Sequence, residues 1–557
     1  MPLVKNQIIP LTIDALSSDG NGVGRFEGQA VFVPFAAVGD VLSVKVVKIC
    51  KSYAFGIVES VLTPGTGRIP ADCPIFGRCG GCCFRHLSYE AELAAKQGFV
   101  ADALRRIGGL DVPVRDILPS PQTERYRNKV QYPLFLAGDG SVQAGFYASR
   151  SHRPLPCGDC LLQPGLLNRI AATLCALLTQ YHISVYDEQA HRGLARHIYL
   201  RHAVTNGSVL VCLVCNGRSL PHAQDICAAL VKAHPEVESV VLNVNTHKTN
   251  VITGKECITL YGPGVLHDTM RGVPVALGPL SFYQVNTEGA NRLYGVAADF
   301  AAPGPEDTLL DLYCGAGTIG LSMAEHCGRL IGVEIVPEAV ESARRNAAAM
   351  GVEHAEFFCA DAGTAAQKLA ADGLLPNIVV LDPPRKGCDE PTLKAVLAMA
   401  PQRIVMVSCN PATAARDLKY LSQHGYAVQA VQPVDMFPRT KHVETVVLLS
   451  HKKPDGHINV KVEFGEGEGK VPLDNIAKRA EEYKPKERVT YKMIKEYIEA
   501  KYGFKVHTAY IAEVKRDLGL PMYDAPNAVE ELKQPRKHPT AEKVEAIRDA
   551  LKHFEVI

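Results

Sequence analysis

The sequence predicts a multidomain α/β protein with four parts in order: a small OB-like β-barrel, a mixed α+β domain, a Rossmann-like domain and a small helical C-terminal appendage. Three observations support this. Short strands punctuated by glycine fill the first sixty residues, apolar strands alternate with helices from about residue 305 to 450, and the composition becomes rich in Lys and Glu after Ser450. A chain of 557 residues is long enough for three or four domains.

The overall composition excludes several classes of protein. A net charge of +1 creates no global attraction to nucleic acid, so any RNA contact must come from local patches or shape. No apolar run approaches the roughly 20 residues that span a bilayer, and the N-terminus lacks a secretion signal. The 17 cysteines then favour reduced thiols, metal ligands or catalysis over disulfides. We expect a cytoplasmic protein without membrane contact.

The N-terminal domain, residues 1–60, alternates apolar runs with glycine turns, which is typical of a small closed barrel. This pattern resembles a TRAM module, an OB-like barrel found on RNA-modifying enzymes. Three of its lysines, Lys45, Lys48 and Lys51, either face phosphate or are solvated residues at the barrel edges.

Residues 61–280 predict the mixed α+β domain, and residues 281–452 predict a parallel sheet covered by helices on both faces. A glycine loop, Asp311-Leu-Tyr-Cys-Gly-Ala-Gly317, closes the first strand of that sheet and opens a helix, where backbone N–H groups face a ligand. About 20 residues on, Glu334 ends the next strand, where a carboxylate accepts ribose hydroxyls. The loop is the S-adenosyl-L-methionine (SAM) variant, and Asp382-Pro-Pro-Arg385 is a methyltransferase mark. Dinucleotide binding is the rival for this fold.

Cys409 follows an apolar strand at the carboxyl edge of the sheet, and Asn410-Pro411 predicts a turn that exposes its thiol to the cofactor cleft. A cysteine after a strand is by itself more often a small buried hydrophobe. Uracil C5 is a poor nucleophile, but a thiolate that adds at C6 lets C5 attack a methylsulfonium. A base must then remove the C5 proton, and Glu444 is the candidate, unless it is only a surface carboxylate at a strand end.

Seven segments resemble, in order, the RNA uracil-C5 methyltransferase family over residues 1 to about 450. They are Phe282-Tyr-Gln-Val-Asn286, Asp311-Leu-Tyr-Cys-Gly-Ala-Gly317, Gly332-Val-Glu334, Asp382-Pro-Pro-Arg385, Ser408-Cys-Asn-Pro-Ala-Thr413, Asp435-Met-Phe-Pro438 and His442-Val-Glu444. RNA cytosine-C5 methyltransferases are the near rivals. Their sequences have a two-cysteine pattern with a Pro-Cys loop, which is not found here.

The resemblance implies a role for each matching residue. SAM would be bound by Gln284, Tyr313, Gly315, Gly317, Glu334 and Asp382. Cys409 would be the nucleophile and Glu444 the base. Phe282 would stack on a uracil extruded from the RNA, and Asp382 would also orient the pyrimidine.

A second group of cysteines has the tight loop spacing that wraps a metal. It comprises Cys73, Cys79 and Cys82, with Cys157 or Cys160 as the fourth ligand, and four thiolates suit either zinc or an iron–sulfur cluster. The rRNA branch of the resembling family carries a 4Fe-4S cluster on this spacing, which implies ligation by Cys73, Cys79, Cys82 and Cys160 and leaves zinc as the weaker alternative. Such a cluster would be structural or would shape RNA, since polar methyl transfer does not need it.

The expected partner is RNA, with no DNA. The tRNA-acting branch of the family typically lacks both the barrel and the cluster, so their presence points to 23S rRNA. The enzyme is expected to be a monomer. The segment Arg125-Tyr-Arg-Asn-Lys129 suits phosphate contact and stacking, with a solvated loop as the alternative. The same chemistry on tRNA uridine is the first rival function. A non-catalytic RNA-binding assembly factor is the second, which intact Cys409 and Glu444 disfavour.

Two further expectations concern domain boundaries. Residues 85–118 should pack on the methyltransferase domain, as they do in the resembling family. Residues 456–557 lie outside the resemblance, and their helical segments 489–503 and 508–519 predict a helix-turn-helix or winged-helix appendage. Its role is open between RNA docking, protein contact and simple stabilisation.

Overall fold

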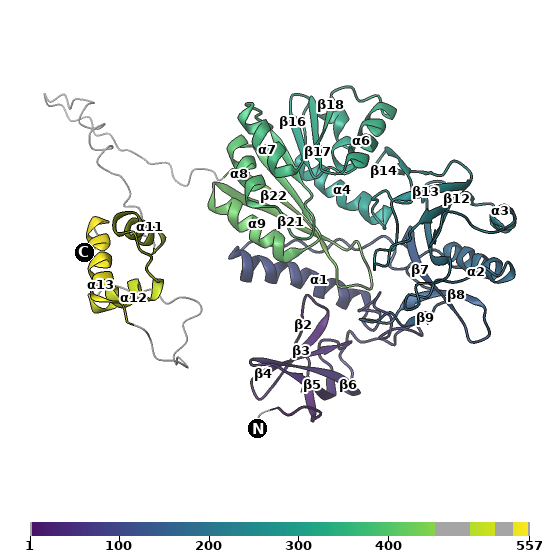
Figure 1. Cartoon of the computed structure of the whole chain (residues 1–557), viewed down its shortest axis with the longest axis horizontal. Helices are drawn as coiled ribbons and strands as arrows, with labels where there is room; N and C mark the ends of the chain where they lie inside the picture. Colours follow the sequence, from purple (N-terminus) through teal and green to yellow (C-terminus); the bar gives the residue numbers. More distant parts are fainter. Residues whose placement is uncertain (1–2, 452–490, 519–537, 555–557) are drawn as a thin grey trace. The chain divides into compact units, whose positions relative to one another are not determined.

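A computed structural model of the chain describes residues 3–451, 491–518 and 538–554. The chain divides into two compact units, Met1–Gly456 and His457–Ile557 (Figure 1). In the described ranges, none of the helices has the length and apolar character that crossing a membrane requires.

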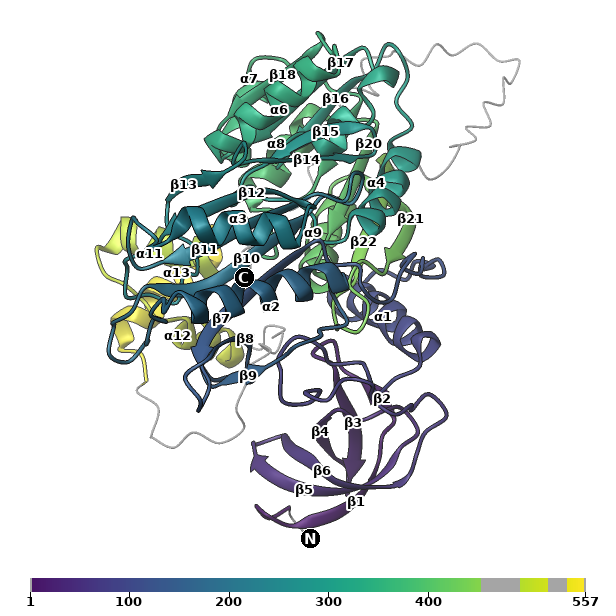
Figure 2. The same cartoon turned by 90° about the vertical axis from the view of Figure 1, so that its right-hand side faces the viewer.

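The N-terminal barrel is one six-stranded sheet in the order β1-β5-β6-β4-β3-β2 (Figure 2). Its strands are β1 (Ile8–Thr12), β2 (Ala15–Leu16), β3 (Asn21–Phe26), β4 (Gln29–Pro34), β5 (Val41–Ile49) and β6 (Tyr53–Thr63). Alternate residues such as Val31, Val33 and Val44 point inward and make a small closed core. The predicted barrel is therefore confirmed.

Helix α1 (Tyr89–Ala103) follows the cysteine loop, residues 73–83. It continues into a π-helical turn, η1 (Leu104–Gly108), which ends at left-handed Gly109. Ser88 caps its first turn by accepting a hydrogen bond from the Ala91 N–H. Val100, Ala103 and Leu104 join the core beneath one face of the sheet in the third domain. This helix thus packs with a domain whose strands begin about two hundred residues later in the chain.

The central domain is built on a seven-stranded sheet in the order β13-β12-β11-β10-β7-β8-β9, followed by a hairpin. Its elements are β7 (Lys129–Leu136), β8 (Val142–Tyr147), β9 (Pro154–Pro156), α2 (Gly165–Gln180), β10 (Ala195–His202), β11 (Val209–Cys215), α3 (Ala223–Ala233), β12 (Val237–Val244), β13 (Glu256–Tyr261) and the hairpin β14 (Leu266–Met270) and β15 (Val273–Leu277). Strands β10 and β11 are buried along nearly their whole length, which explains the continuous apolar run of β11.

The third domain is a doubly wound sheet in the order β18-β17-β16-β19-β20-β22-β21. Its elements are α4 (Thr287–Ala301), β16 (Thr308–Leu312), α5 (Thr318–Leu321), η2 (Ala324–His326), β17 (Arg329–Glu334), α6 (Pro337–Ala349), β18 (Ala355–Cys359), α7 (Ala362–Ala371), β19 (Ile378–Leu381), α8 (Glu390–Met399), β20 (Arg403–Ser408), α9 (Pro411–Gln423), β21 (Tyr426–Val434) and β22 (Glu444–His451). Pairs among β16 to β20 are parallel, and β22 is antiparallel to both neighbours. One apolar core lies on each face of the sheet, as predicted for a covered parallel sheet.

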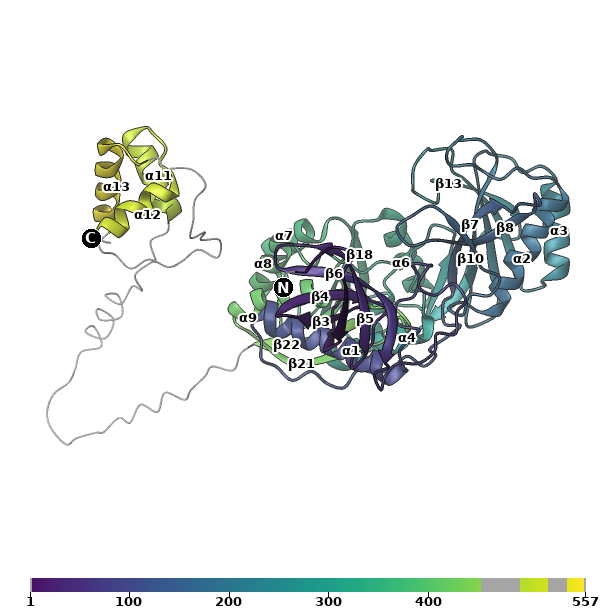
Figure 3. The ribbon, with the colours of Figure 1, turned by 90° about the horizontal axis from the view of Figure 1, so that it is seen from below.

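The C-terminal unit contains three described helices, α11 (Tyr491–Tyr502), α12 (Thr508–Asp517) and α13 (Ala541–His553), gathered into one bundle (Figure 3). Their apolar faces share a core that includes Ile498, Ile511 and Ile547. The predicted helical appendage is confirmed, and α13 is an additional helix that the sequence patterns had not indicated.

Candidate active site

The ends of three neighbouring strands bring Cys409, Glu444 and Asp382 to one edge of the sheet. β20 and β22 are antiparallel with Ser408 opposite Thr445, so the next pair in register is Cys409 with Glu444. β19 lies on the other side of β20 with Leu381 opposite Met406, and Asp382 follows directly. Because the parallel strands β19 and β20 end at the edge where the antiparallel β22 begins, residues far apart in sequence meet here.

The electrostatics of this edge are those of a partly buried and predominantly acidic site. Burial, reinforced by the negative charges of Glu444 and Asp382, raises the pKa of the Cys409 thiol to about 11. Burial, again reinforced by Asp382, raises the pKa of Glu444 to about 8. Burial alone raises the pKa of Asp382 to about 7. The positive charge of Arg385 opposes these effects at Cys409 and Glu444, so Arg385 is a site residue whose role the motif alone did not indicate.

The turn after β20 is fixed by Asn410. Its side chain caps α9 by accepting a hydrogen bond from the Ala412 N–H at 3.1 Å, and it donates to the Arg385 carbonyl at 3.0 Å. The Thr413 hydroxyl donates to the same carbonyl at 3.3 Å. Pro411 begins α9, where the absence of its N–H costs nothing. These bonds tie the loop that carries Arg385 to the loop that carries Cys409.

The backbone of the glycine loop after β16 is left-handed at three positions. Tyr313, Gly315 and Gly317 all have positive φ, at 67°, 56° and 77°. The Gly315 N–H donates to Glu334 Oε2 at 3.1 Å, which holds that carboxylate against the loop. A Cβ on Gly317 would lie 3.1 Å from Leu321 and 3.2 Å from Ala343 and Phe357, so this position is tightly packed against the following helices.

Asp311 contributes a third buried carboxyl near this loop. Its Oδ2 accepts a hydrogen bond from the Gly320 N–H at 2.9 Å, while its Oδ1 is buried and has no partner among the described residues. Burial raises the pKa of Asp311 to about 8, with Asp382 and Glu334 adding to the effect. SAM carries a positive sulfonium and a positive ammonium group, and a cation entering this pocket would favour the ionised form of each carboxyl. The residues present therefore fit this cofactor.

The segment that carries Phe282 and Gln284 crosses from the central domain into α4. Asn128 donates to the Gln284 carbonyl at 2.8 Å and to the Thr287 hydroxyl at 2.8 Å, which fixes the backbone there. The Gln284 amide donates to the Tyr294 hydroxyl at 3.3 Å. Phe282, by contrast, is 77% exposed, which is rare for a phenylalanine and leaves its ring free to stack.

The anchoring loop, residues 435–440, holds the strand that begins at Glu444. Lys96 Nζ of α1 donates to Asp435 Oδ1 at 2.7 Å and to Glu92 Oε1 at 2.7 Å, and all three side chains are fully buried. Asn286 donates to the Met436 carbonyl at 2.9 Å. Asp435 belonged to one of the family-like segments, but the lysine that neutralises it lies more than three hundred residues earlier. No local pattern could have connected the two.

The predicted metal cysteines lie near one another without surrounding a single point. In residues 3–451 and the described C-terminal helices, no group of three or more His, Cys, Asp or Glu side chains could hold one metal ion. The thiols nevertheless lie close enough to interact electrostatically, because burial together with the charges of Cys160 and Cys73 raises the pKa of Cys79. Burial raises the pKa of Cys82 to about 12 against the opposing charge of Arg85, with Cys160 and Cys79 adding to the rise.

This cysteine loop also contacts the anchoring loop directly. The Cys83 and Phe84 N–H groups both donate to the Arg439 carbonyl, at 3.0 and 3.1 Å. The Tyr126 hydroxyl donates to the Pro438 carbonyl at 3.0 Å. Any change in the cysteine loop would therefore be transmitted to the backbone that precedes Glu444.

The stacking role considered for residues 125–129 is wrong for the tyrosine. Tyr126 is buried by its contact with the anchoring loop, and Asn128 is buried against the Gln284 segment. Arg125 forms an ion pair with Asp159, with its Nη1 2.6 Å from Oδ1. The mixture of cations and aromatics resembled an RNA-binding loop because local composition does not show which side chains are buried.

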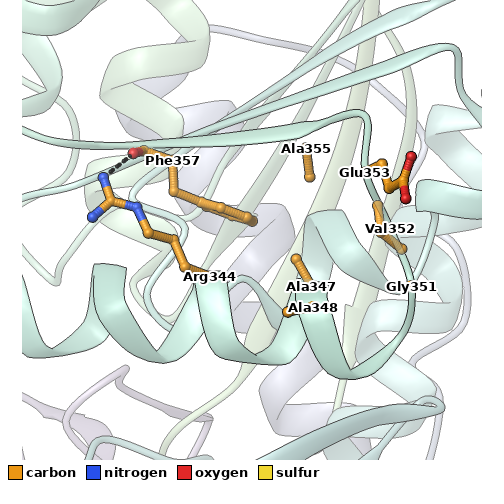
Figure 4. Close-up of a pocket in the computed structure, with 8 residues that line it drawn as sticks. All are labelled: Arg344, Ala347, Ala348, Gly351, Val352, Glu353, Ala355 and Phe357. Atoms are coloured by element: carbon orange, nitrogen blue, oxygen red, sulfur yellow. Dashed lines mark hydrogen bonds between the residues drawn. The ribbon is translucent and has the colours of Figure 1, made fainter.

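A cavity of about 400 Å³ lies elsewhere in the same domain, between α6 and the beginning of β18 (Figure 4). Arg344 borders it and donates to the Phe357 carbonyl at 2.7 Å. The loop at Gly351–Glu353 closes the cavity on the amino-terminal side of the strand. Since the glycine loop and Cys409 lie at the carboxyl ends of the strands, this cavity is separate from the candidate site.

Comparison with known proteins agrees with this geometry. Residues 88–452 match the family described as tRNA (uracil-5-)-methyltransferase, and residues 2–58 match the TRAM domain. An uncharacterized RNA methyltransferase of Halalkalibacterium halodurans is 42% identical over 452 residues, covering 81% of this chain and 98% of that protein. One from Clostridium tetani is 39% identical over 451 residues, with the same coverage of 81% and 98%.

A solved structure is also similar over most of the chain. It is the Pyrococcus abyssi tRNA (uracil-54, C5)-methyltransferase in complex with S-adenosyl-L-homocysteine, with a TM-score of 0.63 and 27% sequence identity. The match covers 79% of this chain and 99% of that one. The similarity therefore extends through the barrel-containing unit and is not confined to the doubly wound sheet.

Proposed function

The chain belongs to the tRNA (uracil-5-)-methyltransferase family and carries a TRAM domain, and from that premise we propose that it methylates C5 of a uracil in 23S rRNA through a covalent bond to Cys409. It is an RNA methyltransferase that depends on SAM. The observation that carries the proposed chemistry is the register of β20 and β22, which sets Cys409 beside Glu444 with Asp382 on the adjacent strand.

Each proposed step uses a group at that edge. The Cys409 thiolate adds to C6 of an extruded uracil, and the electron pair of the C5–C6 bond moves into the ring carbonyl as an enolate. SAM, when bound, would supply the electrophilic methyl group that the enolate carbon C5 takes up, with S-adenosyl-L-homocysteine as the leaving group. Glu444 then accepts the C5 proton, and the electron pair of the C5–H bond forms the C5–C6 double bond and expels the Cys409 thiolate.

The protonation states support an order of events. In the free protein the thiol of Cys409, with a pKa of about 11, and the carboxyl of Glu444, with a pKa of about 8, are both largely protonated at neutral pH. Each group needs its ionised form to react. A positively charged ligand at the edge of the sheet lowers both pKa values, so the pocket becomes reactive chiefly when the methyl donor is present.

We assign the positioning of SAM and of the uracil to the remaining residues at the strand ends. Glu334, held by the Gly315 N–H, is placed to accept ribose hydroxyls. Tyr313, Gly317, Gln284 and Asp382 complete the proposed SAM site. Phe282 is proposed to stack on the extruded uracil, which its exposure supports, and Asp382 also to orient it.

We place a 4Fe-4S cluster on Cys73, Cys79, Cys82 and Cys160. In a cluster each thiolate binds a different iron, so the sulfur atoms lie further apart than around one tetrahedral zinc ion. Cys160 and Cys73 raise the pKa of Cys79, and Cys160 and Cys79 raise that of Cys82, so these thiols share one region, which supports a shared ligand. Anaerobically purified protein should then absorb visible light and contain iron, and Cys160→Ser should remove both. Zinc at one equivalent without visible absorbance would contradict the cluster.

A second target, tRNA uridine, is favoured by one observation: the Pyrococcus abyssi relative similar over 79% of the chain is named for uracil 54 of tRNA. The spacing of the cysteine loop, which resembles that of the rRNA branch, supports 23S rRNA instead. We propose a cytoplasmic enzyme that acts as a monomer. Parallel incubation of 5-fluorouridine-containing rRNA fragments and tRNA with SAM separates the two, because fluorine at C5 blocks the last elimination.

A stable protein–RNA adduct is expected with rRNA and wild-type protein, and none with Cys409→Ala. An adduct only with tRNA would move the target to the second candidate. No adduct with either RNA, or an undiminished adduct with Cys409→Ala, would defeat the covalent mechanism.

A further inference from the structure

Three aromatic side chains form a contiguous group on the TRAM barrel. Phe32 of β4 and Phe55 of β6 are direct partners in register, with ring centroids 5.7 Å apart. Tyr53 of β6 meets both rings edge-on, 5.7 Å from Phe32 and 5.6 Å from Phe55. Each ring thus holds the other two in place, which is the arrangement of a rigid surface.

The three rings point away from the barrel core. Strand residues alternate between two faces, and Val31 and Val33 on either side of Phe32 are fully buried. Ala54, between Tyr53 and Phe55, is fully buried as well. Tyr53 is 37% exposed, and Phe32 and Phe55 are half-buried. A barrel that needs only its inner face for stability has no structural use for this outer cluster.

Lysines surround this aromatic group on the adjacent strand. Lys48 of β5 is the register partner of Phe55, and Lys45 is the partner of Ile57, so both lie on the outer face. Lys51 is exposed in the turn that leads into Tyr53. Among residues 3–451, Lys45 lies 3.9 Å from Glu59, whereas Lys48 and Lys51 have no carboxylate within ion-pair distance. The patch is therefore aromatic at its centre and positive at its edge.

We propose that Phe32, Tyr53 and Phe55 form a stacking platform for unpaired bases of the RNA substrate, with Lys48 and Lys51 contacting the phosphates. Flat exposed rings bind any base through its face, and cations beside them neutralise the backbone, which together favour single-stranded RNA over a duplex. This inference rests on the proposed function, because it assigns a second contact to the same RNA. The whole chain carries little net charge, so such a local patch is where affinity must arise.

The position of the platform suits an extended RNA. Phe35 lies three residues further along the same chain segment, roughly 10 Å at the usual rise of a strand, and its ring packs 5.1 Å from Phe76 of the cysteine loop. The cysteine loop in turn contacts the Arg439 carbonyl in the anchoring loop before Glu444. A series of packing contacts and hydrogen bonds therefore links the strand that carries Phe32 to the loop before Glu444.

The test measures binding of the full-length protein to a short fluorescein-labelled oligocytidylate, which offers no uracil to the catalytic pocket. The double variant Phe32→Leu/Phe55→Leu keeps apolar packing and removes the flat rings. Tyr53→Ser is compared with Tyr261→Ser, which makes the same change at a tyrosine that is 43% exposed on β13 of the central domain. Circular dichroism melting confirms that each variant is folded.

Loss of the rings should weaken oligocytidylate binding about tenfold, and Tyr53→Ser several-fold, while Tyr261→Ser leaves it unchanged. A duplex of the same length should bind all four proteins alike. Wild-type affinity in the ring variants, or an equal loss in Tyr261→Ser, would overturn the platform. So would an unchanged RNA affinity with altered sedimentation, which would mark the patch as a protein contact. Because the assay needs neither SAM nor Cys409, its failure is distinct from failure of the adduct experiment.

Discussion

Replacing Lys96 by methionine should destabilise the protein strongly, because this lysine is the only described cation that bonds both Glu92 and Asp435. Its Nζ lies 2.7 Å from an oxygen of each carboxylate and 3.1 Å from the Phe437 carbonyl. Methionine keeps the length and the apolar stem but removes the charge. Two buried carboxylates are then left facing each other, with Arg439 Nη1 still 3.8 Å from Glu92.

The size of the effect follows from the burial of all three groups. Removing one partner of a fully buried ion pair costs about 3–5 kcal/mol. Protonation limits that cost, since neutralising a carboxyl of ordinary pKa 4.5 at pH 7 requires about 3.4 kcal/mol. Burial already raises the pKa of Glu92 against the opposing charge of Lys96, so protonating Glu92 costs less free energy than this. We expect a loss of about 3–4 kcal/mol at pH 7 that becomes smaller towards pH 5, where protonation costs less.

Urea denaturation followed by far-ultraviolet circular dichroism and tyrosine fluorescence measures this loss, since the chain has no tryptophan and 20 tyrosines. Lys394→Met is the matched control, because its Nζ lies 2.7 Å from Glu390 at the same helical spacing but both side chains are largely exposed. That change should cost less than about 0.5 kcal/mol. A loss below about 1 kcal/mol for Lys96→Met, or one equal to the control, would refute the role given to the buried network.

Further predictions concern the active site and the C-terminal unit. Burial raises the pKa of Glu444 to about 8 and that of Asp382 to about 7, so the stability these carboxyls contribute is present below about pH 4 and is lost as the pH rises through 7 to 8. The melting temperature of ligand-free protein should fall over that window, and less in Glu444→Gln; equal curves would contradict the raised pKa. Glu444→Gln should also let an adduct with ordinary uridine RNA accumulate on denaturing gels, since the C5 proton stays; absence of adduct would argue against this base. Cys409→Ser should lower methyl transfer from labelled SAM by at least about a thousandfold, and retention of a tenth of the activity would exclude Cys409 as nucleophile. Deletion of residues 457–557 should leave the melting temperature of the first unit within about 2 °C, because the two units form separate compact bodies; a larger fall would show that they depend on each other.

Local patterns were sufficient where a motif and its element coincide. The glycine loop at Asp311–Gly317 predicted the passage from a strand to a helix, which is found between β16 and α5. The Asn-Pro pair after Cys409 predicted a turn, which lies between β20 and α9. Arg125–Lys129 shows where this reasoning fails. The composition of that segment resembled an exposed RNA-binding loop, yet Tyr126 and Asn128 are buried by partners from residues 284 to 438.

The sequence by itself indicated the family, the order of the motifs along the chain and the types of group available for the chemistry. A thiol, a carboxylate and a glycine loop can be identified from their neighbours in the chain, because turn geometry and strand ends are local properties. Only the tertiary structure decided how those groups are tuned. The pKa of Glu444 is high because β20 and β22 bury it beside Asp382, and the anchoring loop before it is held by Lys96 from the other end of the chain. Burial and long-range pairing depend on which surfaces meet, and no local pattern encodes that.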